Sequence, residues 1–293
     1  MKPFLKWAGG KTRLLKAIEM HLPAHFAEWE NAIYVEPFVG GGAVLFRLLD
    51  KYKNIQRAII NDINQTLIDV YRTVQRDPST LISMTTELGK QYLSCGNPIE
   101  RSEFYYKIRL LYNEHECAFE DKLAYFLFLN QTCFNGLYRE NRDGKFNVPH
   151  GKYTNPTVCH ETQIWAAHEL LDRVIILNGD FSTVGMNLEN EEVFFYLDPP
   201  YRPIKENTSM FTSYNRSGFN DKKLNELKNM CHSINERGWH FMMSNSDSLK
   251  KNGDSYFDEA FGDFHIERMS VTRFINQYNA TQRHPNEVLI MNY

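Results

Sequence analysis

The tetrapeptide Asp198-Pro199-Pro200-Tyr201 carries the groups needed to hold a flat base with an exocyclic amine. It follows the apolar run 193–197, which is typical of a buried strand, and ligands of open α/β sheets bind at the carboxyl ends of strands. The two prolines fix the backbone and leave their carbonyls without helical or ladder partners. The carboxylate and a main-chain carbonyl could accept the two amine hydrogens while the aromatic ring stacks on the base. A plain rigid turn is the alternative, but the flanking Asp and Tyr favour a site.

A glycine loop forms a second candidate site. The strand-like run 33–39 leads into Glu-Pro-Phe-Val-Gly-Gly-Gly, which begins at Glu36 and includes Phe38 and Gly40. Glycines allow a ligand to approach the backbone closely. About twenty residues further on, Asp62 closes the second strand, where an acid commonly binds a ribose hydroxyl in dinucleotide folds. These features predict a nucleotide-type site, but they do not separate NAD from S-adenosylmethionine.

Two shorter motifs could complete this site. Residues 4–11, Phe-Leu-Lys-Trp-Ala-Gly-Gly-Lys, form a glycine turn that opens a helix expected over 12–22. Trp7 and Lys11 could grip the amino-acid end of a cofactor, because an ammonium group donates to carboxylates and helix amides favour anions. After the third strand, Asp180 could accept from an adenine amino group while Phe181 packs on the ring. Alone, each motif is typical of an ordinary turn.

Composition indicates a water-soluble α/β chain of ordinary type. The 293 residues are 42% apolar and 24% charged, which is usual for a globular protein. No apolar run approaches the roughly 18 residues that span a bilayer. Five cysteines are scattered without a Cys-x-x-Cys pair, which argues against disulfides or zinc and suits a reducing, cytoplasmic setting. We expect no metal and no membrane.

The charge distribution favours a nucleic-acid partner although the net charge is −3. Residues 1–16 contain five basic side chains and no acid, and residues 268–283 contain three arginines and no acid. A third basic cluster lies in 139–152. One such run is usually only a solvated face. Because all three lie beside the motifs above, we expect a surface that follows phosphates.

Strand-like and helical runs alternate along the chain, which predicts a doubly wound, mostly parallel sheet covered on both faces. The expected strands are 33–39, 58–61, 174–178, 193–197, 239–244, 265–269 and 287–292. The long segment between the second and third strands is helical and aromatic-rich at first and loop-like after residue 130. We therefore expect a catalytic, cofactor-binding domain at 1–64 and 160–293, and an inserted target-recognition subdomain at 65–159.

In combination and in this order, the motifs resemble the α group of amino-methylating DNA methyltransferases, specifically the Dam-like adenine-N6 enzymes. The resemblance runs from Phe4 to the closing strand. It implies a methyltransferase fold, S-adenosylmethionine as the donor, and duplex DNA as the partner. Trp7, Lys11, Asp62 and Asp198 match the cofactor contacts of the family. We expect a monomer, with a partner restriction endonuclease as an open possibility.

The segment from Phe134 to Tyr153 resembles the target-recognition hairpin of that family. The resemblance implies GATC as the recognition sequence, with Arg139 able to read a guanine edge through a bidentate contact worth ~1–3 kcal/mol of discrimination. Gln131 departs from the family, whose members commonly have arginine there. The residues matched to DNA recognition are Lys6, Phe134, Asn135, Leu137, Arg139, Pro149 and Tyr153.

The expected chemistry is methyl transfer to adenine N6. If Asp198 and the Pro199 carbonyl accept its two hydrogens, the N6 lone pair can face the methyl group, and inline displacement follows without a covalent enzyme intermediate. The base must first rotate out of the duplex, to stack on Tyr201. Three alternatives remain: cytosine-N4 methylation, whose enzymes more often have Ser than Asp in the tetrapeptide, a DNA-binding regulator without catalysis, and an NAD-dependent enzyme.

Overall fold

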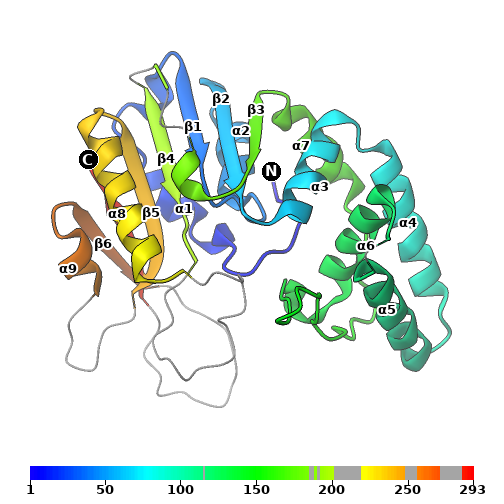
Figure 1. Ribbon diagram of the computed structural model, residues 1–293. Helices are drawn as coiled ribbons and strands as arrows, with labels where there is room; N and C mark the ends of the chain where they lie inside the picture. Colours follow the sequence, from blue (N-terminus) through cyan, green and yellow to red (C-terminus); the bar gives the residue numbers. More distant parts are fainter. Residues whose placement is uncertain (115, 185–187, 190–191, 201–218, 248–255, 271–285) are drawn as a thin grey trace.

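The computed structural model of the chain contains a seven-stranded sheet with the strand order β3-β2-β1-β4-β5-β7-β6 (Figure 1). It describes residues 1–114, 116–184, 188–189, 192–200, 219–247, 256–270 and 286–293. Strands β1 to β5 are parallel where they pair, and β7 runs antiparallel to both of its neighbours. The predicted fold class, a doubly wound and mostly parallel methyltransferase sheet with a helical insertion, is confirmed.

All seven predicted strands are present; three are longer than their predicted runs, and the first ends at Glu36 rather than at residue 39. Their bounds are β1 Ala32–Glu36, β2 Ile55–Asp62, β3 Val174–Asn178, β4 Val193–Leu197, β5 His240–Asp247, β6 His265–Ser270 and β7 Asn286–Met291. β2 begins at Ile55 because that residue already pairs with Ala32, and its carbonyl accepts a hydrogen bond from Arg173 (2.7 Å). β5 continues to Asp247 because polar residues there pair with β7.

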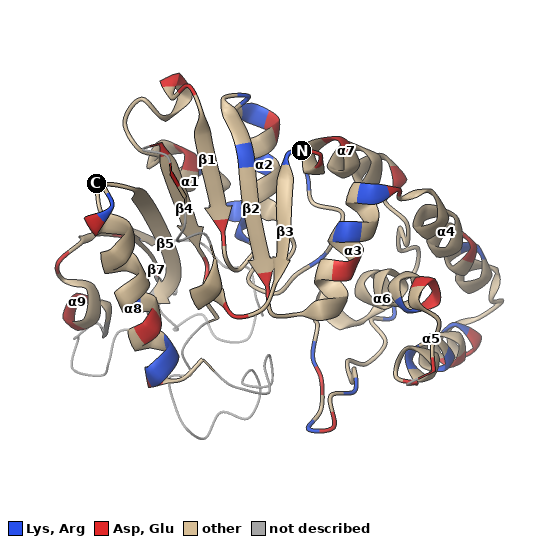
Figure 2. Ribbon diagram, turned by 45° about the horizontal axis from the view of Figure 1, so that its top comes forward, with Lys and Arg blue, Asp and Glu red and all other residues tan. Residues whose placement is uncertain are grey.

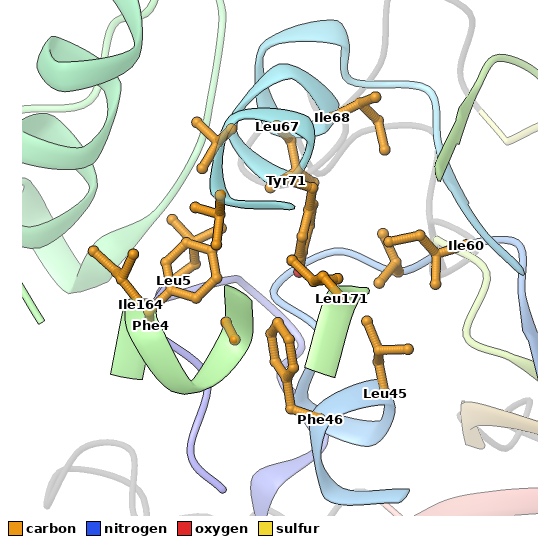
Figure 3. Packing of buried hydrophobic residues seen from close by; sticks show 14 of the residues in the cluster. Phe4, Leu5, Leu45, Phe46, Ile60, Leu67, Ile68, Tyr71, Ile164 and Leu171 are labelled. Carbon is orange, nitrogen blue, oxygen red and sulfur yellow. The ribbon is translucent and has the colours of Figure 1, made fainter. Parts of the chain in front are cut away.

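Helices cover both faces of the sheet, and the alternation of side chains decides which face each strand residue meets. On one face, Tyr34 and Phe194 pack with α1, α2, α3 and α7, while Val35 and Phe195 on the other face pack with α8 and α9. In Figure 3, Tyr71 of α3 lies among Phe4 and Phe46 of the first face, with ring centroids 6.0–6.2 Å apart. The helices of these two layers are α1 Leu15–Met20, α2 Ala43–Lys51, α3 Gln65–Arg76, α7 Glu161–Leu171, α8 Asp221–Glu236 and α9 Tyr256–Phe261.

The N-terminal helix differs from its expected range of 12–22. It consists of a 3-10 turn, Lys11–Arg13, followed by α1, Leu15–Met20. No side chain caps either piece, and tight 3-10 turns are common at such uncapped helix ends. Short 3-10 turns also occur at Phe26–Glu28, Phe134–Gly136 and Phe181–Thr183.

The inserted segment forms a helical group beside the β3 edge of the sheet (Figure 1). Its helices are α4 Ser79–Ser94, α5 Pro98–Tyr112 and α6 Phe119–Thr132. α4 and α5 pack on α6, whereas α3 contacts β2, β3 and α7 as well as α6. α3 therefore joins the helical group to the sheet. The division at residues 64/65 and 159/160 remains a prediction.

The C-terminal end of α6 holds the N-terminal segment of the chain. The Asn130 side chain accepts from the Lys6 amide (3.0 Å) and donates to the Lys6 carbonyl (2.7 Å). Gln131, which is buried, donates to the Phe4 carbonyl (3.1 Å). Gln131 thus has a structural contact in this chain at the position where the family commonly has arginine.

Gly42, the residue before α2, allows a test of packing against backbone strain. It has φ of 70°, and an added Cβ would lie 2.7 Å from the Tyr71 hydroxyl and 2.9 Å from Phe46. Gly238 has nearly the same φ, 71°, with nothing within 4 Å of such a Cβ. Gly238→Ala should therefore cost ~1–2 kcal/mol of unfolding free energy through strain alone.

Gly42→Ala should cost a further ~1–3 kcal/mol, because the methyl group also overpacks the core. Denaturant unfolding of both variants, read by circular dichroism, measures the difference. Equal losses for the two variants would contradict the close packing around Gly42.

Candidate active site

Asp198 lies directly after β4, at the carboxyl end of the strand that pairs with β1. Its Oδ1 atom is 3.1 Å from the Lys11 ammonium nitrogen and accepts from the Ser244 hydroxyl at 3.4 Å. The Ser244 hydroxyl also contacts the Tyr196 hydroxyl at 2.7 Å. The carboxylate is therefore held by groups from two distant parts of the chain, the N-terminal turn and β5. Asp198 lies at the point between β1 and β4 where the order of the strands reverses, and this is the usual position of a ligand in such sheets.

Burial dominates the electrostatics of this edge. It raises the pKa of Asp198 above the usual range of a carboxyl group, against the opposing charge of Lys11. Burial likewise raises the pKa of Glu36 well above its usual range, although the Tyr34 hydroxyl donates to it at 2.7 Å. The Asp198 charge adds to this shift. Burial thus opposes ionisation of both carboxyl groups, whereas the Lys11 ammonium group favours the ionised form of Asp198.

A second carboxylate, Glu287 of β7, reaches the same lysine. Its Oε2 atom is 3.7 Å from the Lys11 nitrogen, and both side chains are only 4–5% exposed. Lys11 therefore lies between Asp198 and Glu287. Sequence reasoning missed Glu287, although an acid opening the apolar run 288–291 was an available signal. The proposed contact of Lys11 with the carboxylate of a cofactor remains a prediction.

The glycine loop is fixed from both sides. The Gly40 amide donates to Asp62 Oδ2 at 3.0 Å, and its carbonyl accepts from the Tyr71 hydroxyl at 2.9 Å. Asp62 also accepts from the Asn64 amide at 2.9 Å. Burial raises the pKa of Asp62, while these amide hydrogen bonds oppose the shift. Glu36 and Asp62 end β1 and β2, so both acids lie at one edge of the sheet (Figure 2).

Phe38 and Phe181 form an aromatic pair at the ends of β1 and β3, with ring centroids 5.0 Å apart. Asp180 caps the short turn at Phe181 and accepts from the Ser182 amide and from Lys223 of α8 (2.7 Å). Burial acts to raise the pKa of Asp180, but the hydrogen bonds from Lys223 and Ser182 outweigh it and lower the pKa. Lys223 is a neighbour of this site that sequence reasoning did not find.

Trp7 connects the glycine loop with the hairpin. An added Cβ at Gly40 or Gly41 would lie 2.7–2.9 Å from Trp7, so the two glycines form the surface on which it packs. The indole ring also stacks on Tyr138, with ring centroids 5.6 Å apart and an angle of 16° between the planes, and lies 6.5 Å from the Phe126 ring. The predicted nucleotide site and the predicted recognition hairpin are thus in direct contact through one indole ring.

Exposed side chains lie at the base of the hairpin. Phe134 is 50% exposed, and its amide donates to the carbonyl of exposed Pro149 (2.9 Å). Asn135 has φ of 55°, and its amide donates to the Tyr153 hydroxyl (3.0 Å). Leu137 is half-buried. Five of the seven residues matched to DNA recognition therefore lie together, with Phe134 and Asn135 exposed.

The basic residues of the hairpin are oriented by neighbours. Arg139 donates from Nε to the Asn147 side chain (2.7 Å) and from Nη2 to its carbonyl (3.3 Å). Lys6 donates to the Gln131 carbonyl (3.1 Å), and its ammonium group lies 4.9 Å from the centroid of the Tyr153 ring. Basic and acidic side chains alternate in the hairpin beyond Arg139 (Figure 2).

One face of α5 fixes the returning strand of the hairpin through its backbone. Tyr105 and Arg109 both donate to the Val148 carbonyl (2.8 and 3.1 Å). Asn113 donates to the Phe146 carbonyl (3.0 Å) and accepts from the Phe146 amide (2.8 Å). The spacing of four residues places these side chains on one face of the helix. No sequence pattern identified these residues. They hydrogen-bond to backbone atoms, which every residue type has, so the sequence of the hairpin carries no sign of the contact.

The remaining residues of the tetrapeptide are only partly described. Pro199 is buried and Pro200 is half-buried. Tyr201 lies outside the described residues, as does most of the basic run 268–283. The predicted stacking of Tyr201 on a base therefore remains a prediction.

Several general features bear on the reaction class. All five cysteines are free. Within the described ranges, no group of three or more His, Cys, Asp or Glu side chains is arranged to hold a metal ion. No helix in the described part of the chain is both long enough and apolar enough to cross a membrane.

The chain matches the family described as D12 class N6 adenine-specific DNA methyltransferase over residues 7–275. It is 42% identical to a type II methyltransferase of Methanocaldococcus jannaschii, M.MjaIII, over 100% of this chain and 99% of that protein. It is 29% identical to the DNA adenine methylase of Escherichia coli K12, over 99% and 95% of the two chains.

Among solved structures, an rRNA methyltransferase of Streptomyces viridochromogenes, aviRa, aligns with 96% of this chain and 84% of its own, at TM-score 0.38 and 11% identity. The match over most of the chain shows the family: the chain belongs to the D12 class N6 adenine-specific DNA methyltransferases. It is an adenine-specific DNA methyltransferase, which confirms the resemblance drawn from the motifs.

Asn113→Ala should loosen the returning strand of the hairpin, because the Phe146 amide and carbonyl both lose their partner. Hydrogen exchange at the Phe146 amide should become faster by roughly tenfold or more, corresponding to ~1–2 kcal/mol. Asn97→Ala, which removes the N-cap of the same helix, should leave Phe146 protection unchanged. Unchanged exchange in Asn113→Ala would contradict the role of this face of α5.

Proposed function

We propose that the chain transfers a methyl group from S-adenosylmethionine to N6 of an adenine that is rotated out of duplex DNA, within the sequence GATC. The observation that carries the proposal is Asp198, held by Lys11 and Ser244 at the carboxyl end of β4. The glycine loop lies at the same edge of the sheet, and Trp7, which packs on that loop, also stacks on Tyr138 of the hairpin.

The residues present fit a nucleoside-bearing donor. The backbone of the glycine loop is fixed by Asp62 and Tyr71, and Phe38 and Phe181 provide apolar ring surface nearby. Asp62 and Asp180 provide acceptors for hydroxyl and amino groups, since each carboxylate oxygen has a further lone pair. When bound, S-adenosylmethionine supplies an electrophilic methyl carbon. The protein supplies the binding site and the orientation of the donor.

Asp198 supplies the acceptor for the amine of the target base. A partly buried carboxylate, here 21% exposed, accepts an N–H hydrogen bond more strongly than a fully exposed one, because less water competes. With the Pro199 carbonyl as the second acceptor, the lone pair of N6 turns toward the donor. The N6–CH3 bond forms as the S–CH3 bond breaks, and the surplus N6 proton leaves to solvent.

DNA recognition is assigned to the hairpin and to Lys6. Exposed Phe134 can fill the space left by the rotated base, and Arg139, oriented by Asn147, can present its remaining N–H groups to a guanine edge. Rotation of the base costs a few kcal/mol, so a side chain that fills the gap supports it. Cytosine-N4 methylation is the less favoured alternative, because Asp198 stands in the tetrapeptide and the family is adenine-specific.

Asp198→Ala should reduce adenine methylation by about 10²–10³-fold or more, because the pre-positioned acceptor of the amine is lost. Nucleoside mass spectrometry of DNA incubated with S-adenosylmethionine measures the product, and DNA binding should remain. Asp172→Ala, an exposed position after α7, is the control. Activity of Asp198→Ala near that of the unaltered chain would refute the role of Asp198 as acceptor of the amine. If the product were N4-methylcytosine, the target base would be cytosine and not adenine.

Arg139→Ala should relax sequence choice at one base pair. Loss of a bidentate guanine contact corresponds to ~1–3 kcal/mol, or roughly 5–150-fold in discrimination. Arg142→Ala, an exposed neighbour, should instead weaken methylation of all sites equally, as expected for a phosphate contact. Sequencing of the methylated adenines in host DNA measures both. Methylated adenines outside GATC, made by the unaltered chain, would contradict the proposed sequence specificity but not the proposed methyl transfer to adenine.

A further inference from the structure

We propose that Glu287 of β7 is a positioning residue for methyl transfer: it shares the Lys11 ammonium with Asp198 and thereby leaves the Asp198 carboxylate able to accept from the target amine. This inference rests on the proposed function and concerns a residue outside the motifs of the sequence. It begins from the geometry of one buried lysine between two carboxylates.

The direction of β7 brings Glu287 to the site. In the five parallel strands, the ligand edge is the carboxyl end, but β7 is antiparallel to β5 and β6. Its first residues therefore lie at that edge. Glu287 pairs with Ser246 of β5 in register, two residues beyond Ser244, which donates to Asp198.

The charges of the cluster give Glu287 a chemical consequence. When Asp198 and Glu287 are both ionised, one ammonium group faces two carboxylates, and these three groups together carry one net negative charge. Without Glu287, Lys11 and Asp198 would form a neutral pair. N6 becomes positively charged as it accepts the methyl group, so a net negative cluster stabilises the transition state and a neutral pair does so far less.

No other described group around Asp198 replaces this charge. Tyr34 and Glu36 face it from β1, Tyr196 from β4 and Ser244 from β5. Burial favours the neutral carboxyl of Glu36, and the hydroxyl groups are uncharged. If Glu287 served only to compensate the charge of buried Lys11, its loss would not affect the reaction, because Asp198, 3.1 Å from the ammonium nitrogen, already compensates that charge.

The test is Glu287→Gln, with Glu287→Asp and Glu267→Gln as comparisons. Glu267 lies on neighbouring β6 and is 44% exposed, so its variant makes the same chemical change away from the site. Single-turnover methylation with saturating S-adenosylmethionine and GATC duplex isolates the chemical step. Glu287→Gln should slow it by ~10-fold or more with donor and DNA affinities within ~3-fold, since only transition-state stabilisation is lost. Glu287→Asp should recover part of the rate, and Glu267→Gln should match the unaltered chain.

The pH dependence separates positioning from a folding defect. The Glu287 charge raises the pKa of Asp198, so its removal lets Lys11 lower that pKa. The acid limb of the single-turnover rate should therefore move to lower pH in Glu287→Gln, whereas a misfolded fraction would lower the amplitude without moving the limb.

A Glu287→Gln variant with an unaltered rate and an unmoved limb would overturn the inference alone. An unaltered chain that transfers no methyl group from S-adenosylmethionine to adenine would overturn the proposed function and the inference together. Thermal unfolding of each variant by circular dichroism confirms that equal amounts of folded protein are compared.

Discussion

The buried Lys11 ammonium group is the interaction on which the site depends. A charge at 4% exposure is stable only with close partners of opposite sign, and here Asp198 and Glu287 provide them. Satisfying that charge brings the N-terminal turn, the loop after β4 and the start of β7 to one point. The Asp198 carboxylate is therefore also part of what holds three distant segments together.

The N-terminal segment also connects the glycine loop with the hairpin. Asn130 holds Lys6 by both of its backbone groups, and Trp7 next to it packs on the glycine loop and on Tyr138. The hairpin is in turn fixed from behind by α5 through Asn113. The glycine loop and the hairpin thus contact one short, doubly anchored segment, which limits how far either can move without the other.

Much of the fold could be predicted because its causes are local. Apolar runs bounded by turns gave the seven strands, and errors of a few residues arose where polar residues extend a strand by pairing, as in β5. The family was evident because the tetrapeptide at Asp198 and the glycine loop need particular residue types. Glu287 and Asn113 escaped, because their roles depend on partners from distant parts of the chain or on backbone atoms.

The sequence by itself determined the alternation of strands and helices, the residue types at the strand ends and the family, since each follows from nearest neighbours or from a motif that chemistry constrains. Only the tertiary structure decided which charges meet. Because the last strand is antiparallel, its first residues lie at the carboxyl ends of the parallel strands. No periodicity within that strand reveals this position. Long-range pairing of buried charges is fixed by topology, because burial requires a partner wherever the chain happens to supply one.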